Sequence, residues 1–305
     1  MASPTLATPT PPPTLPSVGY LGPPSSYSHQ AALECFDNNT HTFVSQTTIA
    51  DIFVAVQSKT VTYGVVPFEN STNGSVVFTL DLFCDRNNTY PDVHICGETY
   101  LDVHHCLLSC EEEIKSLKRL YSHPQAFGQC EVWLNSTVKG VERIDVSSTS
   151  KAAEKAKNEP GAAAIASRIA ADVHGLKVLA RNIEDTSDNT TRFFVLSATE
   201  RSEPTQLDGR SDKTLLSFIT DHQPGALCDG LKVFKDFGLN LTSIVSRPSR
   251  KMPWNYIFFV EFEGHEKTEN VTDALEALKP HCAEMRVLGS FIDKQKLRKP
   301  SAVVA

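Results

Sequence analysis

The residues best suited to chemistry lie in one short stretch, 189–196, where a polar run leads directly into an apolar one. The apolar part is typical of a strand, so Thr191 and Arg192 are expected at the mouth of that strand. A hydroxyl and a guanidinium at such a place could bind or polarise a small polar molecule. The same pattern also fits a capped loop whose Asn and Thr side chains satisfy only their own backbone.

Four more polar clusters follow strand-like apolar segments, and they favour the first interpretation. The clusters centre on Ser26, Asn70, Ser122 and Ser148. In open α/β sheets, ligands bind outside the carboxyl ends of the strands. Hydroxyl and amide side chains that recur at helix starts, beside free backbone N–H groups, predict a cleft lined by neutral donors. Such a cleft suits a small organic anion.

Composition excludes several classes of protein. The chain has 305 residues, 40% of them hydrophobic, which is enough for two or three domains with cores of their own. A net charge of -7 and the lack of a basic, aromatic stretch argue against a nucleic-acid partner. No apolar run approaches the ~20 residues that span a bilayer, and the first basic residue is Lys59. We therefore expect a cytoplasmic protein without a membrane partner.

Neither a metal nor a cofactor is expected. The eight cysteines lack paired ligand spacing and are predicted to be buried free thiols. The ten histidines include no H-E-x-x-H pattern, and His104 and His105 are assigned to a predicted strand over 98–108 or to its end. The glycine fingerprints of nucleotide sites are also missing from the sequence.

The order of elements predicts an α/β chain that is followed by a smaller α+β domain. Residues 1–16 hold six prolines and no charge, which predicts a disordered tail. Strands and helices alternate from there to residue 198, and 199–211 is a polar linker. Residues 212–292 show the order βαββαβ, a ferredoxin-like module, and 293–305 form a tail.

Several motifs resemble those of the prephenate dehydratase family, in that family's order. They are G-Y-L-G-P at 19–23, G-V-V-P-F-E-N-S-T-N-G-S at 64–75, S-H-P-Q-A at 122–126, S-S-T-S-K-A-A at 147–153 and D-N-T-T-R-F at 188–193. In the last module, G-A-L at 225–227 and S-R-P at 246–248 are similar to the two motifs with which the ACT domain of this family binds phenylalanine.

The resemblance implies a catalytic domain at 17–198 with two lobes like those of type II periplasmic binding proteins, the second lobe at about 104–180. It also implies decarboxylating dehydration of prephenate to phenylpyruvate in phenylalanine biosynthesis, in a homodimer or homotetramer. Feedback by L-phenylalanine would act at the ACT domain, through Gly225, Ala226, Leu227, Asn240, Leu241 and Ser246. The glutamate that the family carries before S-R-P is Val245 here, which bears on the strength of that control.

Roles for individual residues also follow from the resemblance. Thr191 is expected to hydrogen-bond the departing hydroxyl, with Glu69 or His123 as the alternative if a stronger acid is needed. Arg192 either pairs with a substrate carboxylate or belongs to a structural ion pair. The substrate-binding residues are predicted to be Ser26, Asn70, Ser71, Ser122, Ser148, Thr149, Arg192 and Phe193.

Two rival functions remain open at this point. Arogenate dehydratase performs the same elimination on the aminated substrate, and the motifs above do not separate the two. The other rival is a non-catalytic sensor of phenylalanine or a keto acid. The presence of every hydroxyl-bearing motif argues against a sensor, and assays with both substrates would separate the two enzymes.

Overall fold

The computed structural model describes residues 15–199, 204, 211–251 and 253–297. Most of the predicted tail at 1–16, most of the predicted linker at 199–211 and the end of the tail at 293–305 lie outside the described residues. None of the described helices is long and apolar enough to cross a bilayer. All eight cysteines are free, but only Cys106 and Cys130 are buried. The prediction of buried thiols is wrong for Cys110 and Cys228, which are exposed, and the other four cysteines are only partly buried.

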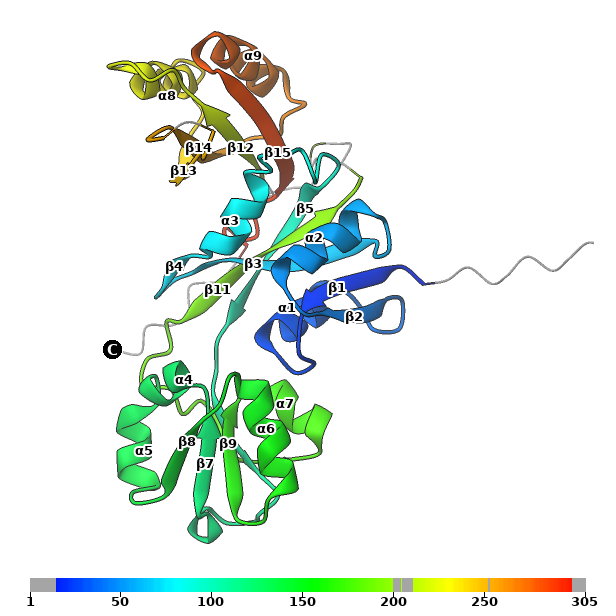
Figure 1. The fold of residues 1–305 in the computed structure, drawn as a ribbon, viewed down its shortest axis with the longest axis vertical. Helices are drawn as coiled ribbons and strands as arrows, with labels where there is room; N and C mark the ends of the chain where they lie inside the picture. The colour runs from blue at the N-terminus through cyan, green and yellow to red at the C-terminus, as the bar shows by residue number, and fades with distance from the viewer. Residues whose placement is uncertain (1–14, 200–203, 205–210, 252, 298–305) are drawn as a thin grey trace, which may run out of the picture.

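Three sheets lie one after another along the molecule (Figure 1), and the first lobe, in the middle, is built on the largest of them. Its strand order is β2-β1-β3-β11-β5, with β4 paired to β3. Strand β1 is parallel to β2 and β3, whereas β11 is antiparallel to β3 and β5. The strands are β1 (Ser17–Leu21), β2 (Thr42–Gln46), β3 (Tyr63–Asn70), β4 (Gly74–Ser75), β5 (His94–Asp102) and β11 (Thr190–Ser197).

Three helices cover this sheet: α1 (Tyr27–Cys35), α2 (Ile49–Gln57) and α3 (Val77–Phe83). Helix α2 begins in a capping box, in which Thr48 accepts from the N–H of Asp51 and the Asp51 carboxylate accepts from the N–H of Thr48. Its apolar face packs closely on β3 at Gly64. A Cβ at Gly64 would lie 2.6 Å from Cγ2 of Ile52, so the absence of a side chain there sets the distance between helix and sheet.

The second lobe carries a five-stranded sheet of order β10-β6-β9-β7-β8. Strand β7 is parallel to β8 and β9, and β6 is antiparallel to β9 and β10. The strands are β6 (Cys106–Ser109), β7 (Arg119–Ser122), β8 (Glu142–Asp145), β9 (Ala162–Ala166) and β10 (Lys177–Ala180), and the helices are η1 (Ile114–Ser116), α4 (Pro124–Gly128), α5 (Glu131–Thr137), α6 (Thr149–Asn158) and α7 (Arg168–His174).

Small residues decide how the second lobe packs. Strand β9 reads Ala-Ala-Ala-Ile-Ala and is buried throughout, as expected for a central strand covered on both faces. Helix α6 lies against it through Ala152, Ala153 and Ala156, which are fully buried. Alanine on both surfaces lets the helix approach the sheet closely and fixes the position of its first turn.

The predicted strand over 98–108 is two strands in different sheets. Strand β5 ends at Asp102 in the first lobe and β6 begins at Cys106 in the second, so residues 103–105 cross between the lobes. The alternating pattern continues through this crossing because Val103 and His105 are buried there as well. Alternation of apolar residues reports burial on one side, and it cannot reveal that the chain changes sheet.

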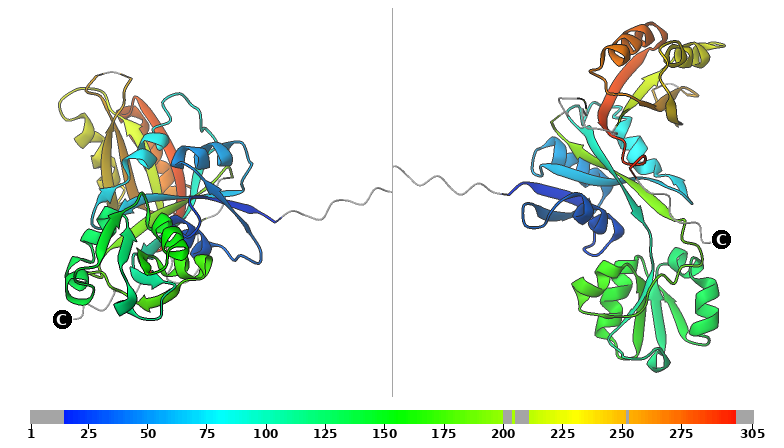
Figure 2. Two further views of the ribbon diagram at one scale, coloured as in Figure 1. Left: turned by 60° about the horizontal axis from the view of Figure 1, so that its bottom comes forward. Right: turned by 180° about the vertical axis from the view of Figure 1, so that it is seen from behind.

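The C-terminal domain has the predicted order βαββαβ and the sheet order β13-β14-β12-β15, with all neighbouring strands antiparallel. Helices α8 and α9 cover one face of this sheet (Figures 1 and 2). The elements are β12 (Asp212–Ile219), α8 (Ala226–Asp236), β13 (Leu241–Pro248), β14 (Tyr256–Glu263), α9 (Glu269–Leu278), η2 (Lys279–His281) and β15 (Glu284–Ile292). The exact domain boundaries given above stay predictions.

The opposite face of the C-terminal sheet packs on the first lobe. Leu215, Phe259 and Phe291 share one buried cluster with Phe53 of α2 and Phe194 of β11. Strand β15 continues down to β5, where the two lie side by side in both views (Figures 1 and 2). The C-terminal domain and the first lobe are therefore joined through a common core.

Candidate functional site

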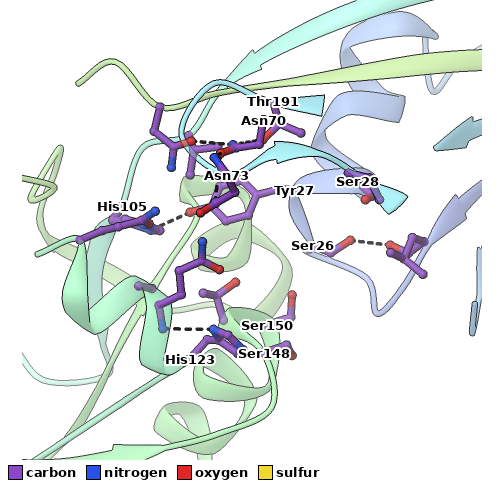
Figure 3. A pocket seen from close by; sticks show the side chains of 18 of the residues that line it. Ser26, Tyr27, Ser28, Asn70, Asn73, His105, His123, Ser148, Ser150 and Thr191 are labelled. Carbon is purple, nitrogen blue, oxygen red and sulfur yellow. Dashed lines mark hydrogen bonds between the residues drawn. The ribbon is translucent and has the colours of Figure 1, made fainter. Parts of the chain in front are cut away.

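A cavity of about 460 Å³ lies between the two lobes, and both lobes contribute to its wall. Its polar lining brings together residues from all five clusters that the sequence singles out. Figure 3 shows this arrangement, with Asn70 and Thr191 on one side and His123 and Ser148 on the other. The polar residues that line it are Ser26, Tyr27, Ser28, Asn70, Asn73, Ser75, His105, His123, Gln125, Gln129, Ser147, Ser148, Thr149, Ser150, Asn189 and Thr191.

The lining of this cavity contains no Lys, Arg, Asp or Glu among the described residues. An anion bound here would therefore rely on hydroxyl, amide and imidazole groups and on the ends of helices. Such donors hold a carboxylate less firmly than a guanidinium does. The arrangement suits a ligand whose negative charge moves or leaves during the reaction.

Thr191 is oriented by Asn70. The side-chain oxygen of Asn70 accepts from the backbone N–H groups of Thr72 and Asn73, at 3.1 and 2.9 Å, which fixes the amide so that Nδ2 faces β11. Nδ2 then donates to Oγ1 of Thr191 at 2.9 Å and to Oδ1 of Asn189 at 2.7 Å. Because the Thr191 oxygen accepts this bond, its own proton can be donated to a ligand in the cavity.

The first turn of α6 offers a cluster of donors to the same cavity. Ser148 is the N-cap and accepts from the backbone N–H of Lys151 at 3.1 Å, and Thr149 follows it in the lining. The next hydroxyl, on Ser150, is 3% exposed and has no hydrogen-bond partner among the described residues. A buried hydroxyl without a partner is rare in proteins, and here it lies in the wall of a cavity. A ligand oxygen would satisfy it.

Two other predicted contacts line the cavity but are already engaged locally. The Ser26 hydroxyl donates to the carbonyl of Leu21 at 2.8 Å and accepts from the N–H of His29 at 3.2 Å, as the N-cap of α1. His123 is the N-cap of α4, and its Nδ1 accepts from the N–H of Gln125 at 3.2 Å. The proton of a neutral His123 imidazole consequently resides on Nε2.

A chain of polar groups that the sequence did not single out crosses the cavity wall. Nδ1 of His105 lies 2.7 Å from the Tyr27 hydroxyl, and its Nε2 lies 2.7 Å from Oε1 of Gln129. Burial lowers the pKa of His105 and raises that of Tyr27, so both side chains are neutral at pH 7. His105 comes here only because the chain changes lobes at 103–105. Tyr27 begins α1 directly after the N-cap Ser26, and Gln129 is the C-cap of α4, the helix that His123 begins.

Ser122 and Phe193, predicted as substrate contacts, do not reach the cavity. The Ser122 hydroxyl is fully buried and donates to the carbonyl of Ile165 at 2.9 Å, so it ties β7 to β9. Phe193 packs in the core between the first sheet and α1, with Val18 and Ala31. Both predictions are corrected, because the motifs containing these residues also carry positions that build the fold.

Arg192, Glu69 and Ser71 lie on the other face of the sheet from Thr191. They line a second cavity, of about 360 Å³, between the first lobe and the C-terminal domain. The Arg192 guanidinium is paired with Glu98 and Glu261, so of its two possible roles the structural ion pair is the one observed. Glu69 and Ser71 are also corrected as groups that would contact a ligand beside Thr191.

The predicted effector residues fall into separate parts of the C-terminal domain. Gly225, with φ of 85°, precedes α8, which begins with Ala226 and Leu227. On the edge strand β13, Leu241 is paired with Phe262 and Ser246 with Phe258. Four strand residues separate these two levels, roughly 13 Å at about 3.3 Å per residue. Asn240 and Leu241 therefore lie at the far end of β13 from Ser246.

Comparison with known proteins shows which family has this fold and this cavity. The sequence profile of prephenate dehydratase matches residues 18–201, more than half of the chain. The chain belongs to the prephenate dehydratase family. The ACT domain profile matches residues 214–280, so the C-terminal domain of this family member is an ACT domain.

Individual relatives of the family agree. A bifunctional chorismate mutase/prephenate dehydratase of Aquifex aeolicus is 44% identical over 274 residues, 90% of this chain and 73% of the relative. The arogenate dehydratase/prephenate dehydratase 2 of Arabidopsis thaliana is 37% identical over 286 residues, covering 90% and 72%. The crystal structure of prephenate dehydratase from Arthrobacter aurescens in complex with L-Phe superimposes with a TM-score of 0.79 at 28% identity, covering 94% of this chain and 93% of that one. These relatives confirm the predicted family and fold class.

Proposed function

We propose that the protein converts prephenate to phenylpyruvate, carbon dioxide and water in phenylalanine biosynthesis, at the cavity between the two lobes. Membership of the prephenate dehydratase family supports the reaction. The observation that carries the location is the wall itself. It joins Thr191, whose proton is free to be donated, to the donors of α6, and the described residues that line it include no Lys, Arg, Asp or Glu.

The chemistry explains why a neutral wall is useful. As the bond between the ring and its carboxylate breaks, the electron pair moves into the ring and expels the hydroxyl on the opposite carbon. The ring becomes aromatic, the carboxylate leaves as neutral carbon dioxide, and the departing oxygen takes up a proton to become water. A cation held against the ring carboxylate would stabilise the substrate more than the transition state, which would slow the reaction.

Each end of the cavity has a task in this proposal. Thr191 donates its hydrogen bond to the departing oxygen, and this bond strengthens as negative charge develops on that oxygen. The first turn of α6, with Ser148, Thr149 and Ser150, binds the carboxylate of the pyruvyl arm, which stays on the product. The helix dipole and the free hydroxyls favour an anion at this position.

The proton for the departing oxygen can come from His123. A threonine hydroxyl is too weak an acid to give up a proton near neutral pH. Of the two stronger acids considered above, Glu69 lies at the other cavity, whereas His123 lines this one. Only the imidazolium form of His123 is a stronger acid than threonine, so donation from His123 requires that Nδ1 take up a proton and give up the bond that it accepts from the N–H of Gln125.

The direct test is turnover of purified protein with prephenate and, separately, with arogenate. We expect phenylpyruvate from prephenate. Phenylalanine formed from arogenate at a higher kcat/KM would assign the protein to the rival reaction, which the name of the Arabidopsis relative makes a specific alternative. If both substrates stayed unchanged while L-phenylalanine still bound, the sensor would be the correct function.

Regulation by L-phenylalanine at the ACT domain is part of the proposal, supported by the phenylalanine complex of the Arthrobacter enzyme. The effector residues predicted from the sequence lie at the start of α8 and at two separate levels of β13, and a second copy of the chain could complete a site among them. We therefore propose a homodimer or homotetramer, and sedimentation with and without L-phenylalanine tests this assembly. A cytoplasmic location also stays part of the proposal, with cell fractionation as its test.

A further inference from the structure

Neighbouring residues on β11 face two different cavities. Thr191 lines the cavity between the lobes, whereas Arg192 points to the other face of the sheet, toward the ACT domain. The Arg192 side chain is only 7% exposed. Whatever holds the Arg192 guanidinium therefore also fixes the backbone that carries Thr191.

The partners of Arg192 come from two domains. Glu98, on β5 of the first lobe, accepts from Nε of Arg192 at 2.8 Å and from the backbone N–H of Lys294 at 2.7 Å. Glu261, on β14 of the ACT domain, accepts from Nη2 of Arg192 and, at 2.7 Å, from the Thr242 hydroxyl on β13. The guanidinium thus bridges the strand next to β11 and the sheet of the regulatory domain.

These groups belong to a buried cluster of charges. Lys213 on β12 is 1% exposed and lies 3.5 Å from Glu261, 3.9 Å from Glu98 and 3.2 Å from Asp293. Burial alone would raise the pKa of Glu261, but Arg192 and Lys213 hold it below its usual range. A buried charge without a partner strongly destabilises the folded protein, so the side chains of this cluster can adopt few arrangements. The adjoining cavity of about 360 Å³ leaves room for Arg192 and Glu261 to move apart.

We propose that Arg192 is a positioning residue for Thr191, and that its ion pair with Glu261 transmits the state of the ACT sheet to the active-site strand. The inference rests on the function proposed above. A ligand that shifts the ACT sheet against the first lobe changes the position of the Glu261 carboxylate. Arg192 follows it, and the start of β11 moves with the Thr191 hydroxyl. The coupling therefore runs through a contact that both sites influence.

The test compares Glu261→Gln with Glu261→Asp and with Arg286→Gln. The first removes the charge at nearly constant volume, and the second keeps the charge on a shorter side chain. Arg286 supplies the matched control, because it also joins the ACT domain to the first lobe, through Asp85 at 3.3 Å and the carbonyl of Tyr90 at 2.9 Å, away from β11. For each protein we would measure kcat and KM, L-phenylalanine binding by calorimetry, turnover at saturating L-phenylalanine, and amide hydrogen exchange.

We expect Glu261→Gln to bind L-phenylalanine within threefold of wild type but to lose most of its effect on turnover. Amides at 190–192 should exchange at least tenfold faster even without ligand, and kcat should fall several-fold at constant KM. Glu261→Asp should recover part of the response, and Arg286→Gln should keep both the response and the protection of β11.

Unchanged exchange at 190–192 in Glu261→Gln would overturn the inference, as would an equal loss of response in Arg286→Gln. Failure of the proposed function would look different, because the wild-type protein would then leave prephenate and arogenate unchanged. If wild-type turnover proved insensitive to L-phenylalanine, exchange at 190–192 would still decide whether Glu261 holds the active-site strand.

Discussion

Thr191 and its neighbour Thr190 have the same side chain but different partners. Oγ1 of Thr191 accepts from Asn70 and has its proton free, whereas the Thr190 hydroxyl donates to Asp102 at 2.6 Å on the other side of the sheet. Thr191→Val should lower kcat by about 10²–10³, the effect typical of losing one donor to a developing oxyanion, with little change in KM. Steady-state kinetics with prephenate measure both constants.

Thr190→Val is the matched control, and we expect its kcat within a few-fold of wild type. Comparable kcat values in the two variants would show that the Thr191 hydroxyl has no special part in the elimination.

His105 links the site to the pH dependence of folding. Its pKa lies below the ordinary 6.5 because of burial, so the unfolded chain binds a proton at a pH where the folded chain does not. The free energy of unfolding should therefore fall as pH decreases from 7 to 5.5, since the folded state is disfavoured wherever the unfolded state holds more protons. His105→Gln, which can keep one hydrogen bond, should reduce this slope in urea titrations at several pH values.

Part of that slope must survive in the variant, because burial also lowers the pKa values of His29 and His174. A slope identical to that of wild type would mean that His105 is protonated to the same extent in both states.

Which motif residues face the cavity could be predicted only in part. The clusters at strand ends located Asn70, Ser148 and Thr191, because the ends of these strands and the starts of the helices that follow them meet at the cavity. The same pattern also selected Ser122, whose hydroxyl serves the fold. The position of Arg192, on the opposite face of the sheet from Thr191, follows from the two-residue period of a strand. That period was available from the sequence, but the glutamate partners of Arg192 come from distant strands and no local pattern reveals them.

At the scale of elements, the first turn of α6 and the end of β7 each present a buried serine with a different use. Ser150 has no hydrogen-bond partner in the described part of the chain and lines the cavity, whereas Ser122 holds β7 to β9 through Ile165. Ser150→Ala should therefore raise KM for prephenate about tenfold, because one hydrogen bond to a charged group is lost. The free energy of unfolding should stay almost unchanged.

Ser122→Ala should do the reverse, lowering the free energy of unfolding by about 1–3 kcal/mol because the Ile165 carbonyl loses its partner, with KM unchanged. Urea unfolding and kinetics on both variants give the comparison. A stability loss without a KM effect in Ser150→Ala would assign its hydroxyl to the fold.

The division between β5 and β6 could not be predicted from the sequence, although most other elements could. Strand order, helix starts and the βαββαβ order of the ACT domain follow from apolar periodicity and N-cap residues. The change of lobe at 103–105 depends on which sheet each half joins, and that choice is made by contacts with β11 and β9, far along the chain. His105 could be recognised as a site residue only once that crossing was known.

On the scale of the whole molecule, the ACT domain is held to the first lobe where β15 passes over β5. A Cβ at Gly289 would lie 2.1 Å from the carbonyl oxygen of Ile95, and its φ of 144° disfavours any other residue. Gly289→Ala should therefore push the two strands apart and lower the free energy of unfolding by about 1–3 kcal/mol, the usual effect of overpacking. Because β12 and β14 belong to the same sheet, the contacts of Arg192 with Glu261 should loosen as well.

Gly97→Ala provides the control on the same strand β5, since its Cβ would meet Val195 at an ordinary 3.5 Å. Urea unfolding measures the stability of both variants, and hydrogen exchange at 94–97 and 190–192 reports the contact between the domains. We expect faster exchange at both segments in Gly289→Ala and wild-type behaviour in Gly97→Ala. If Gly289→Ala lost stability while 190–192 kept its protection, the path from the ACT sheet to Thr191 would not depend on close contact between β15 and β5, and Glu261 alone would have to maintain it.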